Sequence, residues 1–163
     1  MKTLILIRHA KSSWSEPGLS DFDRPLNERG KKDAPEMAKR LSETIKLDHL
    51  VSSPAKRAKR TARFFAEEFG IKKEDIQLME DLYMATQEGF LKSISAIDDK
   101  YEAVALFSHN PGISEFAASL TEVKVDDMPT CAMFALAAET VSWKNFEEAP
   151  KKFLFFDYPK KIS

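Results

Sequence analysis

The chain has 163 residues, 43% of them hydrophobic and 31% charged, which suits one compact domain spanning residues 1–163. Its net charge of −1 provides no overall attraction to nucleic acid or to an anionic membrane, so we expect neither as a partner. The single cysteine, Cys131, excludes an intrachain disulfide and a cysteine-rich metal cage. We expect a cytoplasmic protein, because the first apolar run is too short for a signal peptide and no stretch reaches the roughly 20 residues of a membrane helix.

The chain begins with a strand pattern that is followed by a helix pattern. Residues 3–7 form a near-continuous apolar run, as expected for a strand covered on both faces. After an irregular stretch over residues 10–25, Asn27 can cap a helix, and Pro35 predicts a late start or a kink in it. The apolar face of this helix comprises Ala34, Met37, Ala38, Leu41 and Ile45.

A second strand, a second helix and a short third strand follow. The strand covers residues 49–52, and Ser53-Pro54 after it predicts a helix start with proline in the first turn. Gly70 predicts the end of that helix, and residues 76–79 suit a short strand. The buried stripe of the helix comprises Ala55, Ala58, Ala62, Phe65 and Phe69.

The remaining elements favour an α/β fold in three layers. Apolar runs predict strands over residues 103–107, 133–138 and 153–156. No convincing helix separates the last two strands, so part of a mostly parallel sheet is expected to be antiparallel. Two more helices are marked by Phe90, Leu91, Ile94 and Ile97, and by Ile113, Phe116, Ala117 and Leu120.

Polar side chains follow three of the predicted strands. Arg8 and His9 come directly after the first strand, Arg57 follows the second, and His109 follows the strand over residues 103–107. Sheets of this kind bind ligands at the carboxyl ends of their strands, so two arginines and two histidines are expected to meet at one rim. Arginine matches phosphate oxygens in a bidentate way, and a neutral imidazole beside bound phosphate can attack phosphorus.

Competing interpretations of the same residue types are weaker. His49 has no evident partner and is expected to be structural, and no histidine spacing supports a zinc site. Ser12, Ser13 and Ser15 are either loop residues or phosphate ligands, and the sequence does not decide between these roles. The basic run comprises Lys56, Arg57, Lys59, Arg60 and Arg63, and apart from Arg57 it is better explained as a solvated helix face than as a nucleic-acid patch.

An ordered set of five motifs covers nearly the whole chain. The motifs are Arg8-His9-Ala10, Arg24-Pro25-Leu26 with Glu28-Arg29-Gly30, Ser53-Pro54-Ala55 with Arg57-Ala58 and Thr61, Ser108-His109-Asn110-Pro111, and Met128-Pro129-Thr130. With these motifs in this order, the chain resembles the histidine phosphatase (phosphoglycerate mutase-like) superfamily. Alanine in the third position of the first motif, followed by Lys11-Ser12, resembles the small phosphohistidine phosphatase branch. The serine of the fourth motif stands where that branch has glycine.

The resemblance implies a phosphoglycerate mutase-like fold and a role for each matching residue. His9 would be the catalytic nucleophile, with Arg8, Arg57 and His109 completing the catalytic and phosphate-binding pocket. Arg24 would be a further phosphate-binding arginine. No metal and no organic cofactor is implied. The reaction would have two steps, attack by His9 on phosphorus and then hydrolysis of phospho-His9 by water.

One departure from the superfamily pattern concerns the acid that protonates an alkoxide leaving group. Glu80 and Glu88 are the candidates, and neither stands in the familiar context. A weak or absent acid favours a P–N bond over a sugar ester, because imidazole is protonated readily near pH 7.

The sequence therefore predicts a metal-independent phosphatase that acts on protein phosphohistidine. One alternative is a small-molecule phosphomonoesterase or mutase of the same superfamily. The other is a non-catalytic domain that recognises phosphate or docks phosphorylated proteins.

Overall fold

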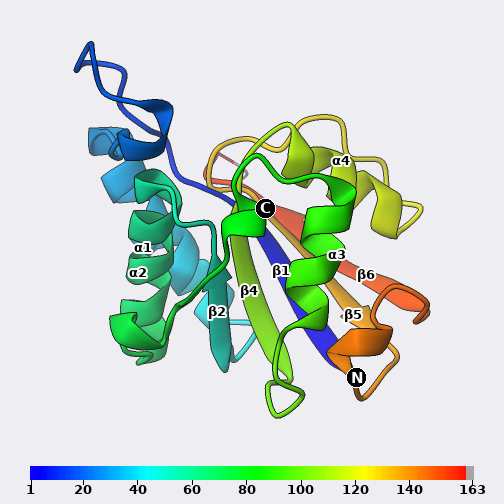
Figure 1. Ribbon diagram of the computed structural model, residues 1–163. Helices are drawn as coiled ribbons and strands as arrows, with labels where there is room; N and C mark the ends of the chain where they lie inside the picture. The colour runs from blue at the N-terminus through cyan, green and yellow to red at the C-terminus, as the bar shows by residue number, and fades with distance from the viewer. Residues whose placement is uncertain (161–163) are drawn as a thin grey trace.

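A single six-stranded sheet organises residues 1–160, the part of the chain that the computed structural model describes (Figure 1). The strand order is β3-β2-β4-β1-β5-β6, and the first four of these strands run parallel. β5 runs antiparallel to both β1 and β6, which confirms the mostly parallel sheet predicted from the sequence. The strands are β1 (Lys2–Arg8), β2 (His49–Ser52), β3 (Gln77–Leu78), β4 (Ala103–Ser108), β5 (Met133–Ala138) and β6 (Lys151–Asp157).

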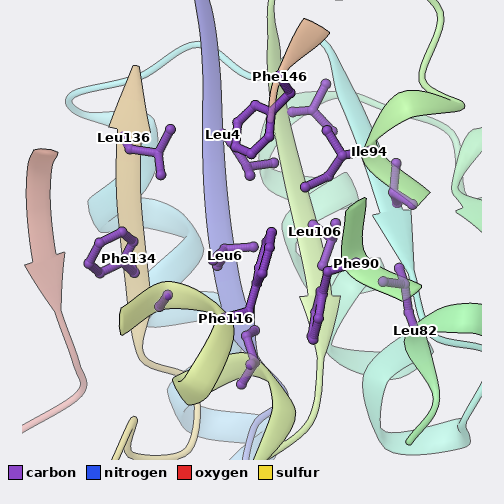
Figure 2. Packing of buried hydrophobic residues seen from close by; sticks show 14 of the residues in the cluster. Leu4, Leu6, Leu82, Phe90, Ile94, Leu106, Phe116, Phe134, Leu136 and Phe146 are labelled. Carbon is purple, nitrogen blue, oxygen red and sulfur yellow. The ribbon is translucent and has the colours of Figure 1, made fainter. Parts of the chain in front are cut away.

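Helices cover both faces of the sheet and complete the three layers. β1 alternates its side chains between the faces, so that Leu4 and Leu6 enter one core and Ile5 and Ile7 the other. The first core packs against α3 and α4 (Figure 2), and the second packs against α1 and α2. The helices are α1 (Glu28–Ser42), α2 (Lys56–Phe69), α3 (Gln87–Ser95) and α4 (Gly112–Leu120), with short 3-10 helices η1 (Asp21–Asp23), η2 (Lys73–Asp75), η3 (Glu80–Leu82) and η4 (Trp143–Asn145).

Two predicted helix starts differ from the structure. α1 begins directly after Asn27, whose side chain accepts a hydrogen bond from the Gly30 amide, so the late start predicted from Pro35 is wrong. The helix continues through Pro35 because Ala34 and Met37 beside it are buried against the sheet.

The start predicted at Ser53-Pro54 is also wrong, because α2 begins at Lys56. The Ser53 amide instead donates to Phe107 O and continues the pairing with β4. The Ser53 hydroxyl accepts from the Ala55 amide and contacts His109, so it is engaged beside the sheet.

No helix within residues 1–160 is long and apolar enough to cross a membrane.

Candidate active site

A cavity of about 660 Å³ lies at the carboxyl ends of β1 and β4, and we call it the His9 cavity. Arg8 at the end of β1 pairs in register with Ser108 at the end of β4, so the next residues, His9 and His109, emerge side by side. Their ring centroids are 5.1 Å apart. Arg24 and Arg57 line the same cavity, and the structure therefore brings all five predicted site residues together.

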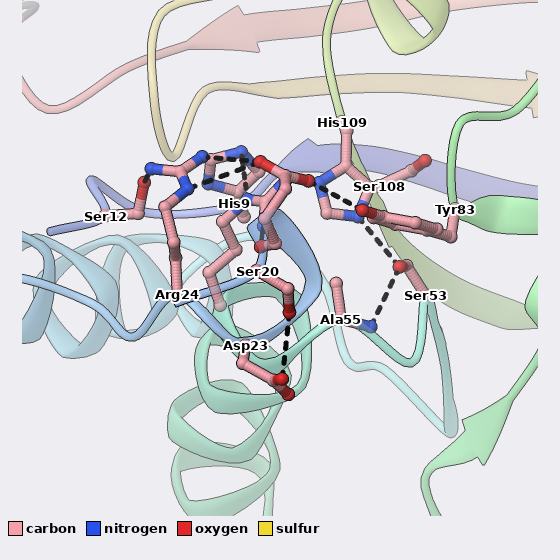
Figure 3. A network of polar contacts seen from close by, with 12 residues as sticks. His9, Ser12, Ser20, Asp23, Arg24, Ser53, Ala55, Tyr83, Ser108 and His109 are labelled. Carbon is pink, nitrogen blue, oxygen red and sulfur yellow. Dashed lines mark hydrogen bonds and ion pairs between the residues drawn. The ribbon is translucent and has the colours of Figure 1, made fainter. Parts of the chain in front are cut away.

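His9 lies within the network of polar side chains drawn in Figure 3, and its contact with Ala10 fixes its tautomer. Its Nδ1 lies 2.7 Å from the carbonyl oxygen of Ala10, which can only accept, so Nδ1 carries the proton. Nε2 is therefore unprotonated, and its lone pair accepts a hydrogen bond from Arg57 Nε at 3.3 Å. Burial and the nearby charges of Arg57 and Arg8 lower the pKa of His9 to about 3, so the ring is neutral at physiological pH.

His109 is the second neutral imidazole of the cavity. Its Nε2 lies 2.8 Å from the Ser53 hydroxyl, while its Nδ1 is buried and has no hydrogen-bond partner within residues 1–160. Burial and the charge of Arg57 lower the pKa of His109 to about 3. A buried ring nitrogen without a hydrogen-bond partner is costly.

Asp21, in η1, links three of the cavity's polar side chains. Its carboxylate accepts from Arg57 Nη2 at 3.0 Å, from Arg24 Nη2 at 3.1 Å and from the Tyr83 hydroxyl at 2.7 Å. The Asp21 carbonyl oxygen also accepts from Arg57 Nη1 at 2.6 Å. Burial alone would raise the pKa of Asp21, but the hydrogen bonds from Tyr83 and Arg57 hold it well below its usual range. Asp21 is therefore an anion in this site.

Arg8 is positioned by the segment that contains the Met128-Pro129-Thr130 motif. Its Nη1 donates to the carbonyl oxygen of Met128 at 2.8 Å. The Asn110 side chain donates to the same oxygen at 3.1 Å, and the Met128 amide donates to the Ser114 hydroxyl. The motif therefore orients the first arginine rather than contacting the cavity through Met128, which is fully buried.

Thr61 joins the loop after β1 to α2. Its hydroxyl accepts from the Ala10 amide at 2.9 Å and donates to the carbonyl oxygen of Arg57 at 2.8 Å. Because Ala10 O accepts a hydrogen bond from the His9 ring, Thr61 fixes the positions of His9 and Arg57 relative to each other.

Gly30 is required by a close backbone approach. A Cβ at this position would collide with the carbonyl oxygen of Lys11, which itself accepts from the Asn27 amide. The absence of a side chain at Gly30 thereby lets α1 pack against the loop that follows β1.

The sequence did not point to several residues that line the cavity, namely Trp14, Asp21, Tyr83 and Glu115. Trp14 is 79% exposed and lies under the Arg24 guanidinium, whose central carbon is 3.5 Å from the ring centroid. Asp21 precedes Arg24 by three residues, and the one signal for it was its place beside that motif. Tyr83 and Glu115 carried no signal in the sequence, because they reach the cavity through the folding of η3 and α4.

The structure shows where the serines and glutamates lie whose roles the sequence left open. Ser12 lines the cavity and accepts from Arg24 Nη1 at 2.7 Å, whereas Ser13 and Ser15 bond to each other at the surface. Glu80 and Glu88 are exposed and do not line the cavity.

His49 lies away from the cavity, as expected for a structural histidine. It stacks on Tyr101, with ring centroids 4.0 Å apart, and its Nε2 lies 2.9 Å from the Gln77 side-chain oxygen. Within residues 1–160, no three His, Cys, Asp or Glu side chains are grouped in a way that could hold a metal ion.

Comparison with known proteins identifies the family. Residues 4–95 match the model of the histidine phosphatase superfamily, branch 1. The chain is also 32% identical to an uncharacterized chloroplastic protein of Arabidopsis thaliana over 152 residues, which are 88% of this chain and 69% of that one. This chain therefore belongs to the histidine phosphatase superfamily and is a hydrolase of the phosphatase type.

Two further similarities bear on the subgroup. The crystal structure of the putative phosphohistidine phosphatase SixA from Agrobacterium tumefaciens superposes with a TM-score of 0.78 at 27% identity, covering 97% of this chain and 98% of that one. Phosphoserine phosphatase 1 of Hydrogenobacter thermophilus is 46% identical over 69 residues, which are 41% of this chain and 32% of that protein. The phosphoglycerate mutase-like fold predicted from the sequence is confirmed.

Proposed function

We propose that this chain is a metal-independent phosphatase that removes phosphate from protein phosphohistidine through a phosphorylated His9. The observation that carries the proposal is the tautomer of His9, which presents the Nε2 lone pair to a cavity lined by three arginines. A neutral imidazole with an unprotonated Nε2 is a competent nucleophile toward phosphorus once phosphate displaces the hydrogen bond from Arg57.

The first step forms a bond between His9 Nε2 and phosphorus as the bond from phosphorus to the substrate nitrogen breaks. The electron pair of the broken bond stays on the substrate imidazole, which leaves in neutral form if its other nitrogen is already protonated. Arg8, Arg24 and Arg57 donate to the equatorial oxygens, and the unpartnered Nδ1 of His109 is a further donor once it carries the proton.

In the second step water attacks phospho-His9, the new P–N bond breaks, and inorganic phosphate leaves. The Nδ1 proton of His9 stays on the ring, hydrogen-bonded to Ala10 O, in both steps. The phosphorylated ring is therefore cationic, and it departs from phosphorus as a neutral imidazole. No metal and no cofactor takes part in either step.

The positions of Glu80 and Glu88 and the charge of Asp21 support a P–N substrate. Glu80 and Glu88 do not line the cavity, and the lowered pKa of Asp21 makes that side chain a poor proton donor near neutral pH. An alkoxide leaving group needs such a donor, whereas an imidazole leaving group does not. The likeness to the putative phosphohistidine phosphatase from Agrobacterium tumefaciens supports the same substrate class.

A small-molecule phosphomonoesterase is the second candidate. Glu115, at the fourth position of α4, lines the cavity and is a carboxyl group that could protonate an alkoxide. The similarity to phosphoserine phosphatase 1 of Hydrogenobacter thermophilus also favours this candidate.

A substrate panel with and without chelator tests the proposal. The panel comprises a phosphohistidine protein, free phosphohistidine, phosphoserine and a sugar phosphate. We expect the phosphohistidine protein to have the highest kcat/KM, with no loss on adding EDTA. A preference for phosphoserine or the sugar phosphate that Glu115→Gln abolishes would favour the second candidate, and loss of activity in EDTA would contradict the metal-independent mechanism.

A further inference from the structure

A second groove, of about 500 Å³, lies on the other side of η1 from the His9 cavity, and we call it the basic groove. Its apolar part is formed by Phe22, Pro25, Leu26 and Pro54. Its rim carries five cations and a single carboxylate, Asp23, which accepts a hydrogen bond from Ser20. The five cations are Lys31, Lys56, Lys59, Arg60 and Arg63.

The basic groove is a neighbour of the His9 cavity and shares no lining residue with it among residues 1–160. Asp21 and Arg57 line the cavity, and the residues next to them in the chain, Phe22 and Lys56, line the groove. The ring of Phe22 packs edge-to-face against Tyr83 of the cavity, with centroids 5.2 Å apart. A chain segment lying in the groove would therefore reach the rim of the cavity.

The charges of this groove are unfavourable for the helix that carries them. α2 has no acidic residue in its first turn and has Lys56 there, although the amino end of a helix favours negative charge. Lys56, Lys59, Arg60 and Arg63 are spaced three or four residues apart and repel one another. None of these four has a carboxylate partner among the ion pairs of residues 1–160. A helix face that is only solvated does not need this arrangement.

We propose that the basic groove docks an acidic segment of the phosphorylated protein substrate, so that its phosphohistidine enters the His9 cavity. The proposal rests on the proposed function and extends it to the choice of partner. The uncompensated positive rim complements glutamate and aspartate side chains, and the apolar part accepts a hydrophobic side chain between them.

A protein segment suits the groove better than a nucleic acid. Single-stranded nucleic acids bind through aromatic side chains on which successive bases stack, and Phe22 is the single aromatic residue of the groove lining. Of the aromatic neighbours on α2, Phe65 is buried in the core, and Phe64 is partly buried against that core with the Arg60 guanidinium 4.7 Å from its ring centroid.

The test compares three substrates and two triple variants. The substrates are a phosphohistidine peptide flanked by glutamates, the same peptide with glutamines in their place, and free phosphohistidine. Lys59→Gln/Arg60→Gln/Arg63→Gln removes charge from the groove. Lys32→Gln/Lys39→Gln/Lys46→Gln removes as much charge from exposed positions outside both the groove and the cavity.

We expect the groove variant to lower kcat/KM for the acidic peptide about tenfold, mainly through the association rate, and to leave the other two substrates unchanged. The control variant should leave all three unchanged. An equal loss for all three substrates, or no loss for the acidic peptide, would overturn the docking role.

A binding experiment separates failure of docking from failure of the proposed function. If no phosphohistidine probe is turned over, the proposed function fails, but the unphosphorylated acidic peptide still reports on the groove. We expect salt-sensitive binding of that peptide, weakened about tenfold in the groove variant. Absence of binding, or equal binding by both variants, would overturn the proposal. Tighter binding of a single-stranded RNA that the groove variant loses would overturn the choice of a protein partner.

Discussion

Arg57 donates a hydrogen bond through its Nε to Nε2 of His9 at 3.3 Å. Nδ1 of the same ring donates a hydrogen bond to Ala10 O, so Arg57 contacts the unprotonated ring nitrogen. The two remaining nitrogens of the guanidinium contact Asp21, so one arginine connects the proposed nucleophile to the anion of η1.

Replacing Arg57 by lysine tests how much the planar guanidinium contributes to the reaction rate. Lysine keeps the positive charge but cannot contact His9 and a phosphate oxygen at the same time through a planar fork. We expect Arg57→Lys to lower kcat/KM by about 100-fold, the usual cost of losing one transition-state donor. Arg60→Lys on the exposed face of the same helix keeps the charge of the basic groove, so it is the control and should match the wild-type rate on free phosphohistidine. Wild-type activity in Arg57→Lys would contradict the role given to the guanidinium.

Neutralising Asp21 should strengthen the binding of inorganic phosphate. The Asp21 carboxylate occupies donors of Arg24, Arg57 and Tyr83, so an incoming phosphate has to compete with it. We expect Asp21→Asn to lower the Ki of inorganic phosphate by about fivefold, a modest effect because the Asp21 side chain is half exposed. Asp23→Asn, in the same 3-10 helix, should leave the Ki unchanged. A weaker or unaltered affinity in Asp21→Asn would show that the carboxylate does not compete.

Thr61→Val should destabilise the protein and slow the reaction together. Valine has nearly the same shape, but it leaves the buried Ala10 amide without its acceptor. The expected cost is about 1–3 kcal/mol in the free energy of unfolding, measured by urea denaturation. Because Ala10 O orients His9, kcat should also fall, whereas Thr44→Val in the exposed turn after α1 should change neither quantity. An unchanged kcat in a folded Thr61→Val protein would contradict the positioning role.

The two buried histidines should make stability depend on pH below neutrality. Their pKa values are about 3 in the folded protein and near 6.5 in the unfolded chain. Above pH 6.5 neither the folded nor the unfolded state binds a proton at these rings. Below pH 6.5 the unfolded state binds more protons, so the free energy of unfolding decreases as the pH is lowered. At pH 5 the loss is about 2 kcal/mol for each histidine. Urea denaturation at pH 7 and pH 5 should show a correspondingly smaller loss in His9→Asn, and an equal loss in both proteins would contradict the lowered pKa of His9.

The sequence predicted the sheet and the residues at its carboxyl edge because both depend on local patterns. Continuous apolar runs mark buried parallel strands, and the residue after each run is carried to the same rim. Arg8, His9, Arg57 and His109 could be placed in this way, and the structure brings them to one cavity. That residues 1–163 form one domain stays a prediction.

Tertiary contacts decided what the sequence could not predict. The start of α2 was misplaced because Ser53 pairs with β4 and contacts His109, and neither contact has a local signal. Asp21 and Tyr83 lie 62 residues apart and meet only through the folded cavity. The groove beside the basic run of α2 could not be predicted, because the apolar residues of η1 and of the following segment reach it only through the fold.

The most direct test of the account is to trap the phosphorylated enzyme. The protein is mixed with a labelled phosphohistidine donor, quenched in alkali within the first turnover, and mapped by mass spectrometry under conditions that preserve phosphoramidates. We expect phosphate on His9, labile in acid, and neither label nor turnover in a folded His9→Asn protein. Phosphate on another residue, or wild-type turnover by His9→Asn, would contradict the mechanism.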